Sequence, residues 1–430
     1  MPPPAPEPGA LLEAMYDAAV AAAHPATCLP QHLPQVPANG RIVVTGAGKA
    51  NAAMAVACEA HYGALGVLDR IDGFVTTRHG FALPTRRIEV VEAAHPVPDE
   101  AGAASAMRAL ELVRQAGPQD LVLVLLSGGA SALWCAPVGG ISLAQKQELT
   151  RLLLRSGATI SEINTVRRHI SLIKGGRLAA AAHPARLLTL AISDVPGDVP
   201  AAIGSGPTVA DPTTLADARA VLARYGITPP DAIARALADP ANETVKPGDP
   251  ALASSLYEIV ARPRASIEAG ARLAIAAGYR AEVLGDALEG EARDVARNHA
   301  ELAIAARRRG QKVAILSGGE LTVTVKGRGS GGPNQEYALG LAIGLEGEPG
   351  ICAIAGDTDG IDGGGGAADD PAGASVFPDT LARARALGLD PAAMLADNDS
   401  TAYFSAVGGL LRRGPTQTNV NDFRAILVDP

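Results

Sequence analysis

The chain has 430 residues, enough for two domains of ordinary size, and 47% of them are hydrophobic although only 3% are aromatic. Its formal net charge of −8 argues against the basic face that a nucleic-acid-binding protein needs. The four cysteines lack zinc-site spacing, and no run of about 18 apolar residues predicts a membrane span. Because no signal-peptide pattern is present, we expect a cytoplasmic protein that binds neither nucleic acid nor membrane.

Short β-branched runs alternate with longer Ala- and Leu-rich segments in the first half of the chain. The predicted strands span residues 41–45, 73–77, 87–92, 121–126 and 187–192. The predicted helices span residues 50–61, 101–116, 143–156 and 172–182. Ser142 followed by Gln145 is a capping-box pattern at the third helix. This alternation predicts right-handed crossovers and an open parallel sheet.

Several prolines between residues 240 and 263 mark the expected crossing between two domains, 1–245 and 246–430. The second region predicts a strand at 281–284, a helix at 291–308, and strands at 312–316, 321–326 and 350–355. Only Ser-Gly-Gly-Glu separates the strands at 312–316 and 321–326, so we expect them to form a hairpin. The second sheet is therefore predicted to be mixed.

Nearly every predicted strand ends in a Gly-rich or charged loop. Such loops follow residues 45, 126, 192, 316 and 355. Ligands of open parallel sheets bind outside the carboxyl ends of the strands. We therefore expect these loops to converge on one cleft.

The first of these loops contains Gly46, Gly48 and Lys49. The glycines resemble the start of a dinucleotide fingerprint, but Asn51 occupies the position of its last glycine, and a tight turn without ligand is an alternative. A lysine at the start of a helix lies at the positive end of the helix dipole, where a cation is disfavoured. An anionic ligand would remove that conflict, so Lys49 is predicted to contact an anion.

The second loop, with Ser127, Gly128, Gly129 and Ser131, follows an unbroken aliphatic run. Its small residues would let backbone N–H groups approach phosphate oxygens, although a plain strand-to-helix turn is the alternative. No Gly-Lys-Ser/Thr follows, so this is not a Walker A loop.

The second half of the chain adds an arginine and a group of carboxylates. Arg328 lies between glycines and can grip a carboxylate or phosphate with two parallel hydrogen bonds. Asp357, Asp359 and Asp362 could hold Mg²⁺ through carboxylate oxygens and water. Aspartate is also common in turns for structural reasons, and that alternative stays open.

Taken together and in this order, these motifs resemble the type II glycerate kinases. The matching segments are residues 46–50, 126–133, 193–198, 203–208, 316–320, 332–336, 356–363 and 414–422. The second half is similar to the domain of that family called MOFRL. The resemblance implies a Rossmann-like parallel-sheet domain, a second α/β domain with a mixed sheet, and a cleft between them. Members of the family phosphorylate D-glycerate with ATP and Mg²⁺, commonly giving 2-phosphoglycerate.

On this basis each candidate residue receives an expected role. Lys49 would contact the transferring phosphoryl group, and Arg328 the glycerate carboxylate or a phosphate. Asp194 would orient or deprotonate the substrate hydroxyl while Asp357 and Asp359 hold Mg²⁺, and an exchange of these roles is left open. The residues expected to contact the nucleotide are Gly46, Gly48, Ser127, Gly128, Gly129, Ser131, Ser317, Gly318, Gly319, Glu320, Asn334 and Glu336.

Two other functions are weighed against the kinase. Some relatives carry the name hydroxypyruvate reductase, which would use the turn at Gly46 for NAD(P)H, but the fingerprint is incomplete and a reductase needs no Ser-Gly-Gly loop. A non-catalytic carboxylate- or nucleotide-binding protein would not need a lysine, an arginine and several carboxylates around one cleft. The oligomeric state is left open, with a homodimer as one alternative.

Overall fold

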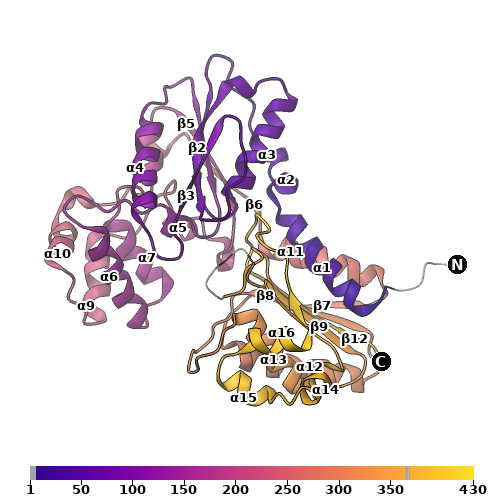
Figure 1. Cartoon of the computed structure of the whole chain (residues 1–430). Coiled ribbons are helices and arrows are strands. Elements are labelled where there is room, and N and C mark those ends of the chain that lie inside the picture. The colour runs from indigo at the N-terminus through magenta and orange to yellow at the C-terminus, as the bar shows by residue number, and fades with distance from the viewer. Residues whose placement is uncertain (1–5, 364–366, 368) are drawn as a thin grey trace. The chain divides into compact units, whose positions relative to one another are not determined.

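The computed structural model describes residues 6–363, 367 and 369–430, and the chain forms two compact units (Figure 1). The middle unit is Cys28–Val260, and the terminal unit combines Met1–Thr27 with Ala261–Pro430. This division differs from the expected ranges 1–245 and 246–430. Strand β6 (Ser255–Ala261) extends the sheet of the middle unit, and helix α1 (Pro8–Ala23) packs on helix α11 (Pro263–Ala276) of the terminal unit.

The middle unit contains the predicted open sheet, with strand order β3-β2-β1-β4-β5-β6. The remaining strands are β1 (Ile42–Ala47), β2 (Ile71–Arg78), β3 (Ile88–Ala93), β4 (Leu121–Leu126) and β5 (Arg186–Ile192). Neighbouring strands from β3 to β5 are parallel, as the sequence predicted. This is the strand order of dinucleotide-binding folds, and it reverses between β1 and β4, the place where ligands usually bind.

Helices cover both faces of this sheet. The helices of the middle unit include α3 (Asn51–Ala64), α4 (Glu100–Arg114), α5 (Ala130–Leu133), α6 (Leu143–Arg155), α7 (Ile160–His169), α8 (Arg177–Ala182), α9 (Leu215–Arg224) and α10 (Asp231–Ala238). In Figure 1, α3 and α4 lie on opposite sides of the strands, and α6, α7, α9 and α10 form a separate group with its own core. The predicted capping box of Ser142 and Gln145 is present at α6. The helix predicted at 172–182 begins only at Arg177, because Gly175 and Gly176 adopt the left-handed conformation.

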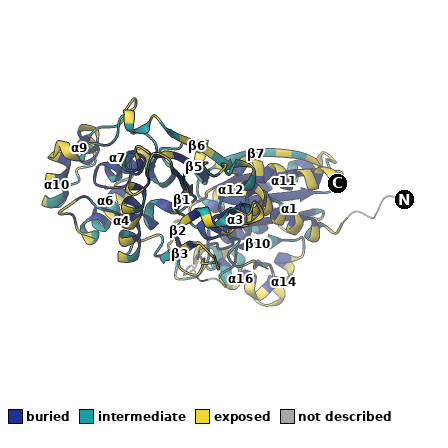
Figure 2. Cartoon of the chain, turned by 90° about the horizontal axis from the view of Figure 1, so that it is seen from above, coloured by how far each residue is buried: buried dark blue, intermediate teal, exposed yellow. Residues whose placement is uncertain are grey.

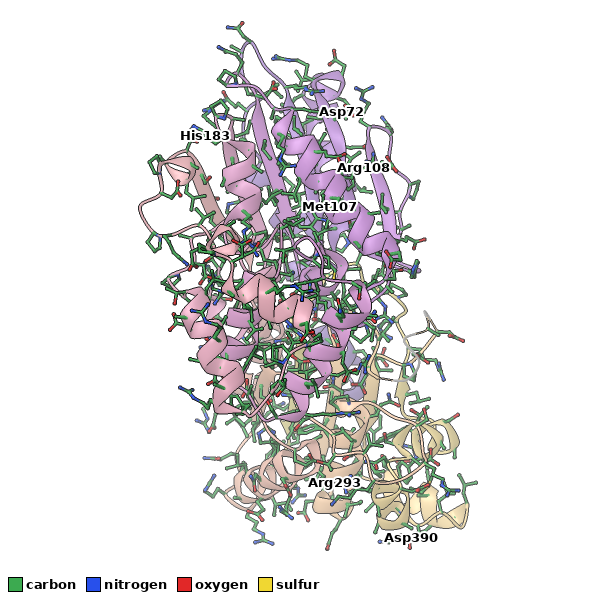
Figure 3. The ribbon with its side chains drawn as sticks, turned by 90° about the vertical axis from the view of Figure 1, so that its left-hand side faces the viewer. Asp72, Met107, Arg108, His183, Arg293 and Asp390 are labelled. Atoms are coloured by element: carbon green, nitrogen blue, oxygen red, sulfur yellow. The ribbon has the colours of Figure 1, made fainter. Side chains whose placement is uncertain are left out.

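Arg108 of α4 fastens this helix to the edge of the sheet (Figure 3). Its guanidinium carbon lies 4.1 Å from the ring centroid of Phe74 on β2. Its Nη1 donates a 3.0 Å hydrogen bond to Glu89 on β3, and this bond lowers the pKa of the Glu89 carboxyl. Cation–π stacking and a charge-assisted hydrogen bond thus hold one helix against two strands.

The terminal unit contains a mixed sheet of order β11-β10-β9-β12-β8-β7. Its strands are β7 (Arg280–Leu288), β8 (Val313–Gly319), β9 (Ile351–Asp357), β10 (Gly373–Val376), β11 (Leu410–Leu411) and β12 (Asp422–Val428). Only β7 and β8 are parallel neighbours among these described strands. The mixed sheet is confirmed, but the hairpin of 312–316 with 321–326 is wrong. Both edges of β8 are already paired, with β7 and β12, so the segment after β8 has no edge to join.

The alternating side chains of its strands divide the terminal unit into three layers. On β12, Ala425 and Leu427 face the core under α1 and α11, whereas Ile426 and Val428 face the core on the other side. The helices of that second face are α12 (Ala292–Arg308), α13 (Pro333–Leu345), α14 (Thr380–Ala386), α15 (Pro391–Ala396) and α16 (Ser400–Val407). Figure 2 shows buried strands and exposed outer helix surfaces. None of the described helices is both long and apolar enough to cross a membrane.

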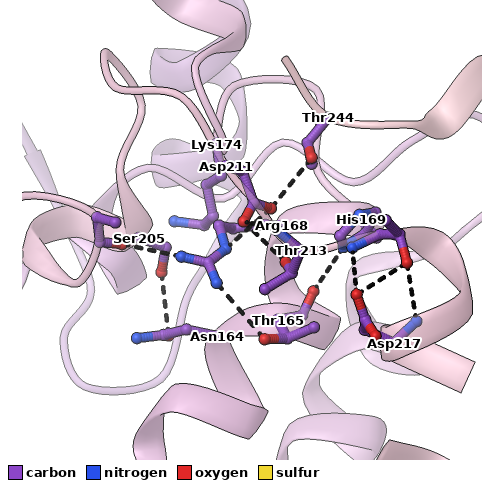
Figure 4. A network of polar contacts seen from close by, with 12 residues as sticks. Asn164, Thr165, Arg168, His169, Lys174, Ser205, Asp211, Thr213, Asp217 and Thr244 are labelled. Atoms are coloured by element: carbon purple, nitrogen blue, oxygen red, sulfur yellow. Dashed lines mark hydrogen bonds and ion pairs between the residues drawn. The ribbon is translucent and has the colours of Figure 1, made fainter. Parts of the chain in front are cut away.

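A buried polar network ties α7 to the segments that follow β5 (Figure 4). Arg168 Nε lies 3.1 Å from an oxygen of Asp211, and their side chains are only 7% and 1% exposed. The Asp211 carboxylate also accepts hydrogen bonds from Thr213 and Thr244. His169, fully buried, lies between the carbonyl oxygen of Thr165 and the carboxylate of Glu243. Charged groups at this depth are stable only because each is paired and hydrogen-bonded.

We expect Arg168→Met to lower the free energy of unfolding by about 3–5 kcal/mol, because it leaves the Asp211 carboxylate buried without its cation. Chemical denaturation of the two proteins measures the difference. Arg224→Met is the matched control, since this arginine pairs with Glu162 while its side chain is 67% exposed, and the change should be much smaller. Equal effects in the two variants would contradict the prediction.

Candidate functional site

The loops after β1 and β4 are joined by hydrogen bonds at the point where the strand order reverses. Lys49 N–H donates to the carbonyl oxygen of Gly128 at 2.8 Å. Ser127 Oγ accepts from Ala50 N–H at 3.0 Å and donates to Asn51 Oδ1 at 2.9 Å. The predicted lysine and the predicted glycine loop therefore lie side by side.

Two glycines make this close approach possible. Gly48 has a φ of +148°, and a Cβ at this position would lie 2.0 Å from Ser127 Oγ. Gly129 has a φ of +84°, and its Cβ would lie 3.0 Å from the His95 ring and 3.5 Å from Lys49 Cγ. A side chain at Gly129 would thus fill the space that Lys49 and His95 border.

The two loops differ in the backbone groups that they can offer to a ligand. The N–H groups of the first turn are occupied, since Gly48 donates to Thr76 at 3.1 Å while Lys49 and Ala50 bind the second loop. Within the described residues, the N–H groups of Gly128 and Gly129 have no acceptor. Backbone binding of an anion is therefore open to the second loop, and the first turn can contribute the Lys49 side chain.

Gly46 has a structural role in the same region. It belongs to β1, and a Cβ there would lie 2.1 Å from the carbonyl oxygen of Leu125 on β4. The residue is needed for strand packing rather than for an exposed turn.

A pocket of about 420 Å³ opens beside the second loop, entirely within the middle unit. Four of the predicted residues line it, namely Ser127, Gly129, Ser131 and Asp194. The loops that follow β3, β4 and β5 all contribute to its wall. The rule that ligand loops gather at the carboxyl ends of strands holds for this pocket.

Four basic residues of this pocket were missed by the sequence analysis: Lys146 and Arg151 on α6, Arg167 on α7 and Lys174 after α7. The first three lie on helices and the fourth on a turn, away from the strand ends that directed the search. The sequence Lys174-Gly175-Gly176 is the one signal that could have drawn attention to them.

Lys174 is 1% exposed, and its ammonium group holds two loops together. It donates to the carbonyl oxygen of Ser131 at 2.9 Å, to Ser131 Oγ at 3.2 Å and to the carbonyl oxygen of Gly204 at 3.4 Å. Ser131 Oγ also bonds to Ser205 Oγ, which donates to Asn164 (Figure 4). Burial lowers the pKa of Lys174 well below its ordinary range, and the charge of Lys146 lowers it further.

In the terminal unit, Asn334 links two carboxylates at the carboxyl-end edge of the sheet. Its side-chain amide donates to Asp362 at 3.1 Å and to Asp422 at 2.6 Å. Asp362 also accepts the N–H groups of Asn334 and Gln335 at the start of α13. Burial raises the pKa of Asp362 to about 7, the hydrogen bond from Asn334 opposes this shift, and the Asp422 charge adds to it.

Glu336 contacts the loop that contains Arg328 indirectly, through Asn398. Its carboxylate accepts from Arg293 at 2.6 Å and from Asn398 at 2.9 Å. Asn398 Oδ1 in turn accepts the backbone N–H groups of Lys326 and Gly327, directly before Arg328. The Arg328 side chain itself is exposed, while its N–H donates to Asp397.

The remaining predicted residues of the terminal unit lie at the ends of β8 and β9. Asp357 Oδ1 accepts the N–H of Asp359, and Asp359 Oδ1 accepts that of Ile361, both at 2.9 Å. Among the described residues, no group of three or more His, Cys, Asp or Glu is placed to hold a metal ion. The turn role of both aspartates is thus observed, and their role toward Mg²⁺ stays a prediction.

The other nucleotide-contact predictions follow β8. Ser317, Gly318 and Gly319 belong to the strand and are buried, and Glu320 is exposed. Arg424 donates to the carbonyl oxygens of Gly318 at 3.0 Å and Gly319 at 3.3 Å. Because Lys49 lies in the middle unit and these residues in the terminal unit, their convergence on one cleft stays a prediction.

Comparisons with known proteins agree with this arrangement of motifs. Residues 11–238 match the family described as "Domain of unknown function (DUF4147)", and residues 313–422 match the MOFRL family. A protein of Thermotoga maritima named D-glycerate 2-kinase is 41% identical over 387 residues, which cover 89% of each chain. The chain belongs to the type II glycerate kinase family.

The fold and other relatives of this family extend the similarity over nearly the whole chain. A crystal structure of glycerate kinase from Thermotoga maritima matches with a TM-score of 0.85 at 37% identity, covering 97% of this chain and 99% of that one. A relative from Agrobacterium vitis carries the name hydroxypyruvate reductase. It is 52% identical over 424 residues, covering 97% of this chain and 94% of its own. The family resemblance predicted from the motifs is confirmed.

Asp362 generates a pH prediction for the terminal unit. Its pKa rises from an ordinary 3.8 to about 7 in the folded chain, so the folded state binds the proton more tightly than the unfolded state. The stabilisation is complete below the ordinary value and is lost as pH rises through about 7. Relative to Asp362→Asn, the wild-type unfolding free energy should fall by roughly 2 kcal/mol between about pH 5 and about pH 8.

Denaturant unfolding of both proteins across this pH range measures that difference. Asp379→Asn is the control, because this side chain is 64% exposed, and its difference from wild type should stay nearly constant. A wild-type advantage that grows with pH would contradict the prediction.

Proposed function

We propose that this protein transfers the γ-phosphoryl group of ATP to D-glycerate at its 2-hydroxyl group. The observation that carries the proposal is the contact between the Lys49 turn and the Gly128–Gly129 loop, at the point where the sheet order reverses. The relatives named D-glycerate 2-kinase and glycerate kinase, alike over most of the chain, support the same activity.

Phosphoryl transfer needs positioned donors and neutralised charge more than covalent catalysis. In this proposal the N–H groups of Gly128 and Gly129 hold phosphate oxygens, and the Lys49 ammonium neutralises charge on the transferring group. Asp194, which lines the same pocket, orients the glycerate hydroxyl or accepts its proton.

The residues proposed for the glycerate carboxylate and for Mg²⁺ belong to the terminal unit. Arg328 binds the glycerate carboxylate, and Asp357 and Asp359 contact the Mg²⁺ that accompanies ATP as substrate. Mg²⁺ commonly takes one or two carboxylates together with phosphate oxygens, so a pair of aspartates suits it.

A hydroxypyruvate reductase is the second candidate, because a relative 52% identical carries that name. The occupied backbone weighs against it: the N–H groups of Gly48, Lys49 and Ala50 all bind protein oxygens and cannot hold a pyrophosphate. Incubation with hydroxypyruvate and NADH, followed by nicotinamide absorbance, separates the two activities. Steady oxidation of NADH would favour the reductase.

Phosphorus NMR of a reaction with Mg·ATP and D-glycerate should show 2-phosphoglycerate, and a 3-phosphoglycerate signal instead would overturn the position proposed.

Lys49→Ala should lower kcat by about 10²–10³-fold, because a donor to developing charge is removed. Circular dichroism should show an unchanged fold. Lys312→Ala, directly before the start of β8 in the terminal unit, is the control and should keep wild-type turnover. A Lys49 variant with near-normal kcat would remove Lys49 from the mechanism.

A further inference from the structure

The pocket beside the glycine loop carries more positive charge than the proposed chemistry has used. Lys146 is 5% exposed and Lys174 is 1% exposed, and Arg167 lines the same space. Of the described residues in the pocket wall, Asp194 alone carries a carboxylate. The fourth basic residue of the wall, Arg151, is 58% exposed and pairs with Glu148. A chain of net charge −8 thus gathers four basic side chains around one cavity.

Lys174 lies beside the charges of Lys146 and Arg167. Burial lowers the pKa of Lys174 most, and the charges of Lys146 and Arg167 lower it further. Burial likewise lowers the pKa of Arg167. Within the described residues, no carboxylate is among the groups that shift either pKa. Desolvated cations that repel one another are costly, and a bound anion would offset that cost.

Within the described residues, the side chains of Lys146 and Arg167 have donors left for a ligand, whereas those of Lys174 are directed to protein oxygens. An ammonium group has three donors, and Lys174 directs its donors to oxygens of Ser131 and Gly204. Among the residues that the structure describes, the Lys146 ammonium donates to Cys135 Sγ at 3.1 Å. Arg167 makes one long contact, 3.5 Å to Asn164 Oδ1, so most of its donors remain available within the described residues.

The size and walls of the pocket indicate what kind of anion it takes. A volume of about 420 Å³ lies in the range of pockets for nucleotide-sized ligands and is far larger than glycerate needs. Val97 and Leu154, both in its wall, are 61% and 60% exposed. Large apolar side chains left open beside a pocket suit a flat apolar group such as a nucleobase.

We propose that this pocket takes the nucleoside triphosphate, with Lys146 and Arg167 binding its phosphate chain and Val97 and Leu154 contacting the nucleoside. Lys174 is a positioning residue that keeps Ser131 and Gly204 in place. The subsite deepens the proposed function and rests on it for the choice of ATP as phosphoryl donor. Lys146 and Arg167 would thus add cationic contacts to the triphosphate beyond the contact that Lys49 makes.

Calorimetric titration of the full chain with Mg·ADP tests the subsite. Lys146→Met and Arg167→Met should each raise the Kd of Mg·ADP about tenfold or more, because each removes a charge-assisted hydrogen bond. The same variants should also bind inorganic tripolyphosphate more weakly, whereas their Kd values for adenosine and for D-glycerate should equal those of wild type. Leu154→Ala should bind Mg·ADP and adenosine more weakly and should bind tripolyphosphate as wild type does.

Thermal unfolding without ligand separates this binding role from a structural one. Lys146→Met should unfold at the wild-type temperature or above, because it removes a buried charge that other cations repel. Lys174→Met should unfold at a lower temperature, because Ser131 and Gly204 lose their donor. Arg224→Met is the control for surface charge outside the pocket, since this arginine is 67% exposed and pairs with Glu162. It should keep the wild-type Kd.

A folded Lys146→Met protein whose Kd for Mg·ADP stays within about twofold of wild type would overturn the subsite, as would a selective loss of D-glycerate binding. The subsite and the kinase activity can be contradicted independently. If wild type forms phosphoglycerate but Lys146→Met and Arg167→Met leave the Kd for Mg·ADP unchanged, the subsite alone is overturned. A Kd that depends on both residues, without any phosphoglycerate, supports the subsite and overturns the kinase assignment.

Discussion

The arrangement of the middle unit depends on one hydroxyl group, that of Ser127. It accepts from Ala50 and donates to Asn51, and so fastens two loops from different strands at the reversal of the sheet. The other two N–H groups of the first turn, those of Gly48 and Lys49, bind the carbonyl oxygens of Thr76 and Gly128. With its backbone donors occupied in this way, the first turn can offer a ligand the Lys49 side chain, and the second loop can offer its N–H groups.

Much of the fold could be predicted because its signals are local. The aliphatic run at β4 and the capping box at α6 each report on a few neighbouring residues, and both were recovered. The hairpin after β8 failed because strand pairing is decided by distant partners, here β12 and β7. Helix α1 was missed although its buried residues follow helical spacing, since its packing partner α11 lies far along the chain.

The candidate site divides in the same way between local and distant causes. Glycine loops at strand ends could be predicted, because the end of a buried parallel strand is visible in the sequence. Lys146 and Arg167 could not, since helices α6 and α7 bring them to the pocket through tertiary packing. Similarly, Asn398 positions the Arg328 loop from a segment that carries no recognisable motif. A side chain that acts through another leaves little trace in the sequence.

The middle unit interrupts the terminal unit, since α1 precedes it in the chain and α11 follows it. During synthesis, α1 would leave the ribosome long before the sheet that it covers exists. At usual translation rates the delay is on the order of tens of seconds. Throughout that time the apolar stripe of Leu12, Met15 and Tyr16 has no native partner, so nascent chains would present it to chaperones. The terminal unit can fold only after the middle unit has been made.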